Sequence, residues 1–584
     1  MGSASSKAYI GDDDYESSAA PEGSAASQAP RNRGASTNVF DIRLYILTEP
    51  CQTATGDAIP CENCQALLNC FSQVRTEGEG RTWVCEFCGC PNKLDIEAGE
   101  MPTGDMVTYV VEGAPAAQEE AKRIFDGEEN SVIFAIDTSG SMGVTQAVAQ
   151  GSMNFGRLKL NEGPQKNISR LQCVQLAVDS QIAAMAKNNP GRKVALVQFS
   201  SAVNAIGGNG VKMTVPNGKF ADFEACIGHL TGHHDAILST SVGECANEIT
   251  DLVYSLKASG GTALGPGLLA SLSLATEGKP GSKIIVCTDG LANVGLGNVE
   301  MTRAVDVQAA EEFYERVGTL AQQRGVSISV ISLVSSECKL NFLASVAELT
   351  EGNVLKVDPM RLSEDFESIL AEKILATDVK ATVILHKALK FKNESNLLNR
   401  GSKLVRVLGN ASQFSSFTFE YANKTKEELV LEEVDVASVT QIPFQLVLEY
   451  KDLKGAKMLK CVTKVLTVSR DQHEAMEGAN TDVLARNIEY QCMNLAQNGQ
   501  YADLKDRQAQ YQDLLDMAPR DEVQERKLRA GAKRMEELQQ ASEEQEIDDL
   551  RAGLPSEGVD AKKQKKRARK DKLAVAIHQL KKAT

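Results

Sequence analysis

The fold of the largest part of this 584-residue chain is decided by the stretch SVIFAIDTSGS at residues 131–141. An apolar run from Val132 to Ile136 ends in Asp137, and small hydroxyl-bearing residues follow. A short apolar run of this kind is typical of a strand that is buried on both faces of a parallel sheet. Comparable runs recur further along the chain, as KVALVQF (193–199), SKIIVCTD (282–289) and SISVISLV (327–334).

Amphipathic segments of helical length separate these strands. They are LQCVQLAVDSQIAAMA (171–186), SVGECANEITDLVYSL (241–256) and AVDVQAAEEFYERVGTLAQQ (304–323). Alternating strands and helices form a parallel sheet with helices on both faces. The pattern therefore predicts a doubly wound α/β domain over residues 131–375.

Polar side chains follow the predicted strands where a ligand site is expected. In an open α/β sheet, ligands bind at the carboxyl ends of the strands. Asp137, Ser139 and Ser141 follow the first strand, Thr262 precedes a helix, and Asp289 follows the strand IIVCT. Oxygen ligands with few charges suit Mg²⁺ or Mn²⁺. The alternative is that these residues only cap helices, as Ser and Asp often do.

The cysteines predict a second metal site. Cys61-x2-Cys64 is followed after twenty residues by Cys85-x2-Cys88. Four thiolates satisfy tetrahedral zinc completely, so such a site holds structure and performs no catalysis. Two other interpretations are weaker: reduced cysteines without a metal, and a redox pair. A RING domain needs eight interleaved ligands, and this segment lacks a histidine.

The remaining segments complete a multidomain α/β organisation. Alternating apolar residues over 376–470 predict an antiparallel β-sandwich, and apolar residues at helical spacing follow it. The expected domains are a disordered arm (1–38), a strand plus zinc ribbon (39–112), the α/β domain (131–375), the sandwich (376–470), a helical domain (474–518) and a charged helical or coiled-coil tail (519–584).

Two motifs resemble known families. Residues 131–375 resemble a von Willebrand factor type A domain with a full metal-ion-dependent adhesion site. The resemblance implies that Asp137, Ser139, Ser141 and Thr262 contact the metal directly or through water, with Asp289 further out. An acidic side chain from a protein partner would complete the coordination.

The cysteine segment, CENCQALLNC followed by WVCEFCGCPNK, is similar to the zinc ribbon of the inner-coat (Sec23/Sec24-type) subunits of COPII vesicles. Those subunits place a ribbon, a type A trunk, a sandwich and helices in the same order, so the resemblance covers about residues 39–518. Two features depart from it: the adhesion motif is intact here, and the gelsolin-like module is replaced by charged helices. A possible small-GTPase partner follows from the resemblance alone.

Both ends of the chain carry candidate membrane signals. Met1-Gly2-x-x-x-Ser6-Lys7 matches the pattern for N-myristoylation of Gly2. A single myristoyl chain needs a second signal, such as a basic segment facing an anionic leaflet. The basic residues near the other end are Lys562, Lys563, Lys565, Lys566, Arg567, Arg569 and Lys570. Alternatives for this run are a nuclear signal, a nucleic-acid tail and a solvated helix end.

The net charge and the absence of catalytic motifs exclude several classes of function. The formal charge of −15 argues against a chain that coats nucleic acid. The sequence has no G-x-x-x-x-G-K-[ST] loop, and its six histidines lack a triad or zincin spacing. We therefore expect a cytoplasmic, membrane-associated, non-enzymatic scaffold that binds an acidic partner. The alternatives are a vesicle-coat component and a ubiquitin-ligase-like enzyme with a divergent zinc module.

Overall fold

The structure is a computed structural model, and it describes most of the chain. The described residues are 2–3, 5, 7–10, 37–54, 56–77, 80–96, 100–112, 130–148, 166–278, 280–300, 303–333, 340–357, 362–392, 394, 401–471, 474, 479–517, 522–551 and 570–580.

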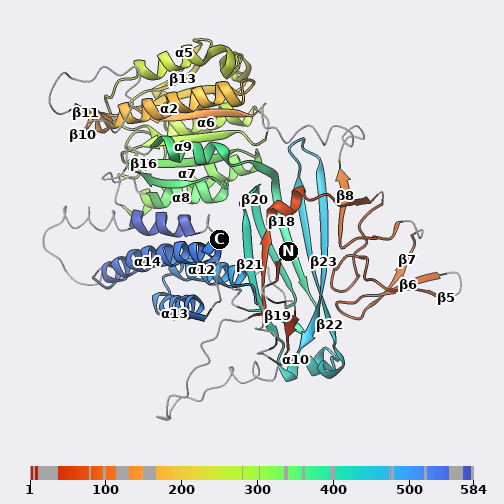
Figure 1. The fold of residues 1–584 in the computed structure, drawn as a ribbon. Coiled ribbons are helices and arrows are strands. Elements are labelled where there is room, and N and C mark those ends of the chain that lie inside the picture. The colour runs from red at the N-terminus through yellow and green to blue at the C-terminus, as the bar shows by residue number, and fades with distance from the viewer. Residues whose placement is uncertain are drawn as a thin grey trace.

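A seven-stranded sheet forms the α/β domain (Figure 1). Its order is β14 (Lys212–Val215), β13 (Val203–Gly207), β12 (Lys193–Phe199), β9 (Ser131–Asp137), β15 (Lys283–Thr288), β16 (Ser327–Leu333) and β17 (Val354–Val357). The five strands β12, β9, β15, β16 and β17 are parallel to their neighbours in this order. Strands β13 and β14 pair antiparallel at the edge next to β12. The predicted doubly wound sheet is confirmed, and the antiparallel edge is an addition to it.

Helices cover both faces of this sheet. Successive side chains of β9 point to opposite sides, and because they are apolar on both sides, each face needs a layer of helices to bury them. Val132 and Phe134 pack in one cluster, whereas Ile133 and Ala135 pack in another. One face carries α2 (Arg170–Asn188), α5 (Val242–Ser255) and α9 (Leu362–Ala371); the other carries α6 (Leu264–Thr276), α7 (Ala304–Gln323) and α8 (Leu340–Leu349), with short α3 (Phe223–Ile227) and α4 (His234–Ile237) nearby.

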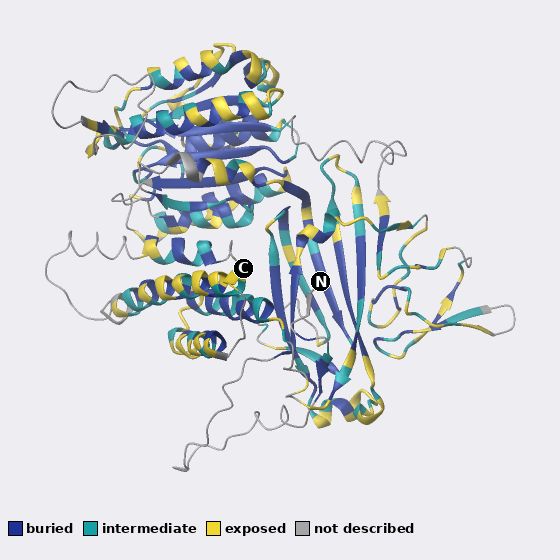
Figure 2. Cartoon of the chain, viewed as in Figure 1, coloured by how far each residue is buried: buried dark blue, intermediate teal, exposed yellow. Residues whose placement is uncertain are grey.

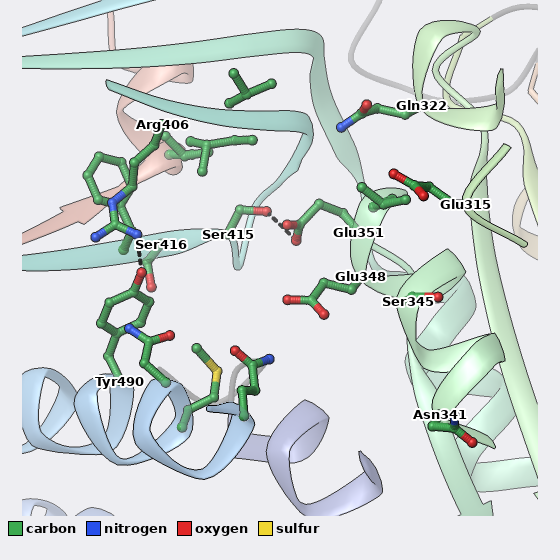
Figure 3. Close-up of a pocket in the computed structure, with 18 of the residues that line it drawn as sticks. Glu315, Gln322, Asn341, Ser345, Glu348, Glu351, Arg406, Ser415, Ser416 and Tyr490 are labelled. Carbon is green, nitrogen blue, oxygen red and sulfur yellow. Dashed lines mark hydrogen bonds between the residues drawn. The ribbon is translucent and has the colours of Figure 1, made fainter. Parts of the chain in front are cut away.

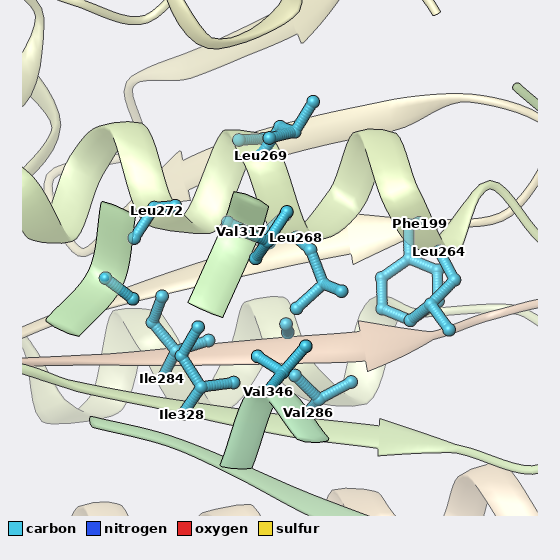
Figure 4. Packing of buried hydrophobic residues seen from close by; sticks show 14 of the residues in the cluster. Phe199, Leu264, Leu268, Leu269, Leu272, Ile284, Val286, Val317, Ile328 and Val346 are labelled. Carbon is cyan, nitrogen blue, oxygen red and sulfur yellow. The ribbon is translucent and has the colours of Figure 1, made fainter. Parts of the chain in front are cut away.

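Helix α6 is buried throughout residues 264–275. Figure 4 shows Leu264 of this helix beside Phe199 and Leu268 on the side of the helix that faces Ile284 and Val286 of β15, whereas Leu269 points to the opposite side.

The β-sandwich is assembled from two separate stretches of the chain, strands within residues 2–112 and strands within 374–469, which differs from the contiguous unit expected over 376–470. One sheet has the order β1 (Gly2–Ser3), β3 (Val39–Arg43), β21 (Ser416–Asn423), β19 (Leu389–Lys392). The other has β20 (Lys403–Ser412), β18 (Ile374–Leu385), β22 (Gln441–Lys451), β23 (Lys457–Ser469), β8 (Met106–Glu112) and β4 (Gln52–Ala54), with β2 (Lys7–Tyr9) paired to β23. A short helix, α10 (Lys426–Leu431), follows β21.

Aromatic packing explains why β3 joins the sandwich. The Phe40 ring lies 5.3 Å from the ring of Phe419 and 4.6 Å from that of Phe444, centroid to centroid. Burying such rings stabilises the pairing of segments that are far apart in sequence.

The expected disordered arm at 1–38 is ordered at its ends. Ala8 and Ile10 are buried in the sandwich core, and the Asn38 amide exchanges two 3.0 Å hydrogen bonds with the Tyr9 backbone. The prediction of disorder rested on the low apolar content of the whole arm, and such an average does not reveal a few anchoring residues. Residues 11–36 lie outside the described part of the chain.

The zinc ribbon is a three-stranded sheet of β5 (Val74–Glu77), β6 (Gly80–Val84) and β7 (Pro91–Leu94) beside the sandwich (Figure 1). The side-chain amide of Gln445 accepts from Leu67 N at 2.6 Å and donates to Leu67 O at 2.8 Å. Lys387 N also donates to Phe87 O at 2.9 Å. The ribbon is therefore attached to the sandwich through its backbone.

The C-terminal helices are packed, which corrects the expected solvated or coiled-coil tail. Helix α14 (Glu522–Arg551) packs on α12 (Thr481–Gln497) and α13 (Tyr501–Met517) through the buried side chains of Leu528, Met535 and Leu538. Figure 2 shows buried and exposed positions alternating around these helices. Residues 570–580 form a further helix, whose Leu580 joins this core and whose Val575 joins the α/β core. None of the helices within the described residues combines the length and apolar character that crossing a bilayer requires.

Candidate metal sites

The four cysteines of the ribbon converge as predicted. The sulfur atoms of Cys61, Cys64, Cys85 and Cys88 all lie within 4.8 Å of one another. Cys61 Sγ is 3.6 Å from Cys88 Sγ, and Cys64 Sγ is 3.5 Å from Cys85 Sγ. Tetrahedral zinc with bonds near 2.3 Å separates its sulfurs by about 3.8 Å. The donor set fits one zinc ion.

Each CxxC pair lies in a tight turn closed by backbone hydrogen bonds. Cys61 N donates to Ala66 O at 2.7 Å, and Cys85 N donates to Cys90 O at 2.9 Å. The second turn contains Gly89 at φ +78°, a conformation that favours glycine. Cys70 and Cys90 lie outside the four-sulfur group.

Asn92 supports the first turn of the ribbon. Its amide nitrogen lies 3.5 Å from Cys61 Sγ, and its oxygen accepts from Glu62 N at 2.9 Å. Burial opposes ionisation of Cys61, but backbone amides of Cys64 and Asn63, together with Asn92, lower the pKa of this thiol to about 7. Burial contributes to raising the pKa of Cys88 to about 11. A bound cation would stabilise all four thiolates.

Glu86 braces the ribbon from within, which sequence reasoning missed. Its carboxylate accepts from Trp83 Nε1 at 2.9 Å and from Ser72 Oγ at 3.0 Å, and it also bonds Asn69. Trp83 is fully buried. The acidic residue between the two cysteines of a knuckle therefore ties both halves of the ribbon together.

The loops of the predicted adhesion site are bound to one another by their backbones. Ser259 N donates to Thr138 O at 2.7 Å, and Gly140 N donates to Gly260 O at 3.0 Å. Gly260 has φ +84°, so a side chain here would be strained. These bonds bring the loop after β9 and the loop before α6 to the same edge of the sheet.

The side-chain oxygens of this site meet beside Gly290. A Cβ atom added to Gly290 would lie 3.4 Å from both Ser141 Oγ and Thr262 Oγ1, and 3.9 Å from Asp137 Oδ2. Ser139 Oγ lies 3.0 Å from Ser141 Oγ, which in turn donates to Asp289 Oδ1 at 2.6 Å. The structure thus brings all five predicted residues together, and their oxygens suit a hard divalent cation.

Two further residues hold the carboxylates of this site. Thr288 Oγ1 donates to Asp137 Oδ2 at 2.7 Å, and Arg170 Nη1 lies 2.6 Å from Asp289 Oδ2. Burial raises the pKa of Asp137 to about 6, although hydrogen bonds from Thr288 and Ser139 oppose this shift. Thr288 ends the strand that precedes Asp289, whereas no sequence signal placed Arg170 here.

Of the proposed lipidation site and basic segment, the structure describes only Gly2 and Lys570. Gly2 is in β1 and is paired with Asp41 of β3. Lys570 begins the helix at 570–580, and the other basic residues of the predicted patch lie outside the described residues.

A pocket of about 690 Å³ lies where α7 and α8 meet β20, β21 and α12 (Figure 3). Its lining includes the carboxylates of Glu311, Glu315, Glu348 and Glu351. The single arginine of the lining, Arg406, bonds Tyr490 and Glu394. The described lining therefore carries more carboxylates than cationic side chains.

The sequence of the ribbon matches a known zinc-finger family, and the chain has a relative among known proteins. Residues 59–97 match the Sec23/Sec24 zinc finger family. Circularly permutated Ras protein 1 of Dictyostelium discoideum is 30% identical over 481 residues, covering 80% of this chain and 54% of that protein. The chain thus spans about half the length of this curated relative.

Solved structures resemble the chain more distantly. The human COPII-coat protein Sec24c is 12% identical with a TM-score of 0.49, over 91% of this chain and 69% of that one. A von Willebrand factor type A protein from Catenulispora acidiphila is 14% identical with a TM-score of 0.38, over 77% of this chain and 89% of that one. The chain combines a Sec23/Sec24 zinc finger with a von Willebrand factor type A-like fold.

Proposed function

We propose that this protein is a non-enzymatic scaffold that binds an acidic side chain of a protein partner through a divalent cation. The observation that carries the proposal is the meeting of Asp137, Ser141 and Thr262 oxygens beside Gly290. These residues would hold Mg²⁺ or Mn²⁺, with Ser139 nearby and Asp289 behind Ser141. The cation would supply a positive centre that accepts one more anionic oxygen.

Partner capture from the native lysate tests this proposal. Wild type and Asp137→Ala are compared in Mg²⁺ and in EDTA. We expect partners that are lost both in EDTA and in Asp137→Ala, while circular dichroism shows the fold retained. The same partner set in all four conditions would contradict the adhesion mechanism and leave the domain as a structural trunk.

The zinc finger supports a second candidate, a role in a vesicle coat. The Sec23/Sec24 match covers residues 59–97, so it supports the ribbon and not a whole-coat function. A coat role requires recruitment by a small GTPase. Pull-down with GTP-loaded and GDP-loaded coat GTPase tests it, and equal recovery in both states would reject it.

The ubiquitin-ligase alternative has less support. Among the described residues, one group of four cysteines has metal-ligand geometry, whereas a RING domain binds two ions. Robust zinc-dependent autoubiquitination in vitro would nonetheless overturn the scaffold proposal.

Membrane association through a myristoylated Gly2 and the basic segment at 562–570 is a further part of the proposal. It places the protein on the cytosolic face of a membrane. Fractionation of wild type and Gly2→Ala tests it, and an unchanged membrane fraction would remove this part.

A further inference from the structure

We infer that Arg170 lowers the affinity of the adhesion site for a divalent cation, because its positive charge already neutralises the carboxylate of Asp289. This inference rests on the proposed function of the site. It concerns a residue outside the adhesion motif, which the folded chain brings to the site.

The position of Arg170 is fixed by its backbone. It is the first residue of α2, directly after the capping residue Ser169. Ser169 Oγ accepts from Gln172 N at 3.1 Å, and Ser169 N donates to Gln172 Oε1 at 2.8 Å. Arg170 N donates at 3.1 Å to the carbonyl of Val144, which follows the loop that carries Ser139 and Ser141. The helix start is thereby tied to the metal loop.

The guanidinium neutralises a carboxylate that has no access to water. The Arg170 side chain is 14% exposed and that of Asp289 is 0% exposed, and the two groups lie 2.6 Å apart. Asp289 Oδ1 is already engaged by Ser141 Oγ. A buried carboxylate needs a positive partner, and Arg170 provides it when no metal is bound.

A divalent cation at the oxygens of Asp137, Ser141 and Thr262 would therefore enter next to an existing positive charge. Ser141 can donate its proton to Asp289 and still offer its oxygen to the cation, so this hydrogen bond does not oppose metal binding. The charge on Arg170 does oppose it. With two carboxylates, one arginine and one divalent ion, the loaded site has a net charge of about +1, which favours an anionic ligand.

Arg170→Met separates this role from a merely supporting one. It keeps an unbranched apolar stem and removes the guanidinium with its charge. We expect Mn²⁺ to bind at least about tenfold more tightly to Arg170→Met than to wild type, because the opposing charge is gone. Arg170→Lys should stay close to wild type. Mn²⁺ affinity is measured on the full chain from the electron paramagnetic resonance signal of the free ion.

Arg303→Met is the matched control. Arg303 lies at the start of α7, as its capping residue, and pairs with an aspartate, Asp306 at 2.7 Å, but its side chain is 78% exposed. We expect no change in Mn²⁺ affinity for this variant. Thermal unfolding adds a second readout: Arg170→Met should melt below wild type in EDTA, and Mn²⁺ should raise its melting temperature by more than that of wild type.

The outcomes are distinguishable. Equal or weaker Mn²⁺ binding by Arg170→Met, with wild type still binding, would overturn the role of Arg170 and leave the adhesion site standing. Loss of binding in both proteins and in Arg170→Lys would overturn the adhesion site itself, and this inference with it.

Discussion

The zinc ribbon and the predicted adhesion site present their candidate metal ligands in different ways. In the ribbon, four cysteines from two short turns form a complete donor set, and two of them, Cys61 and Cys85, are buried. In the adhesion site, oxygens come from separate loops, and the cationic side chain of Arg170 already neutralises one carboxylate.

We expect the zinc to hold the fold of the ribbon, and the proposed divalent cation to serve the binding of a partner. The ribbon has a small core around Trp83 and Leu68, so it depends on its metal for stability. The adhesion loops rest on a large α/β core and are bound to one another by backbone hydrogen bonds, so they keep their shape without a metal. We expect loss of zinc to unfold a module, and loss of the divalent cation to abolish only binding.

Removing zinc ligands should have the largest effect. In the double variant Cys61→Ser/Cys85→Ser, we expect bound zinc to fall from one ion per chain to none. The ribbon should lose its structure, because metal binding supplies about 10 kcal/mol or more in such modules. Metal analysis by mass spectrometry and limited proteolysis of residues 56–96 measure the two effects.

Cys70→Ser/Cys90→Ser is the control for this variant. Both residues lie outside the four-sulfur group, so zinc content should stay at one ion per chain. Zinc retained in Cys61→Ser/Cys85→Ser, or lost in the control, would contradict the assigned ligand set.

The ribbon was also the more predictable of the two sites, because its ligands are set by local spacing. Each CxxC pair forms one turn, and only the distance between the turns depends on the fold. The proximity of the five predicted adhesion residues could be anticipated because the carboxyl ends of parallel strands meet at one sheet edge. Arg170 could not, because its contact with Asp289 depends on how α2 packs against the metal loop.

The dependence on tertiary packing also explains where the observed fold differs from the predicted one. The α/β sheet follows from strong local apolar runs, and those elements were predicted closely. In α14, by contrast, the buried Leu528, Met535 and Leu538 are sparse among charged residues and resemble a solvated helix in sequence. The N-terminal segment at 7–10 joins the sandwich by pairing with β23, more than 400 residues away, which no local pattern reveals.

Breaking the attachment of the ribbon should have the next largest effect. Gln445→Ala removes the hydrogen bonds to Leu67 N and Leu67 O, so Leu67 N loses its side-chain acceptor while Leu67 O keeps the 3.1 Å hydrogen bond from Asn69 Nδ2. A buried polar group left unsatisfied costs about 1–3 kcal/mol, so we expect a loss of about 1–3 kcal/mol in the free energy of unfolding. Denaturant titration of zinc-loaded protein measures it.

Gln441→Ala is the matched control on the same strand, where the side chain is exposed. We expect a change within about 0.5 kcal/mol for it. If the two variants are equally stable, the ribbon is not held by Gln445.

A smaller effect is expected at the adhesion site, where Thr288 positions Asp137. Thr288→Val removes the 2.7 Å hydrogen bond to Asp137 Oδ2 while keeping the shape of the side chain. Hydrogen bonds to charged groups contribute about 1.5–3 kcal/mol, so Mn²⁺ affinity should fall by about tenfold or more. Thr214→Val, which removes an exposed hydrogen bond on β14, should leave the affinity unchanged. Equal affinities for the two variants would show that Thr288 does not position the ligand.

The smallest effect is a pH dependence on the ribbon side of the molecule. His386 follows β18, next to Lys387, whose backbone bonds Phe87 of the ribbon. Burial, with the charges of Lys387 and Lys424, lowers the pKa of His386 from 6.5 to about 4. The unfolded chain therefore takes up this proton at higher pH than the folded protein, so stability falls as the pH drops from 6.5 towards 4.

We expect this histidine to cost about 1–2 kcal/mol in the free energy of unfolding at pH 5 relative to pH 7. The measurement compares wild type with His386→Gln by denaturant titration at both pH values, because the difference between them removes zinc release and other common acid effects. His233→Gln, on an exposed residue of the α/β domain, is the control and should retain the wild-type slope. A slope that is unchanged in His386→Gln would show that His386 does not cause this pH dependence.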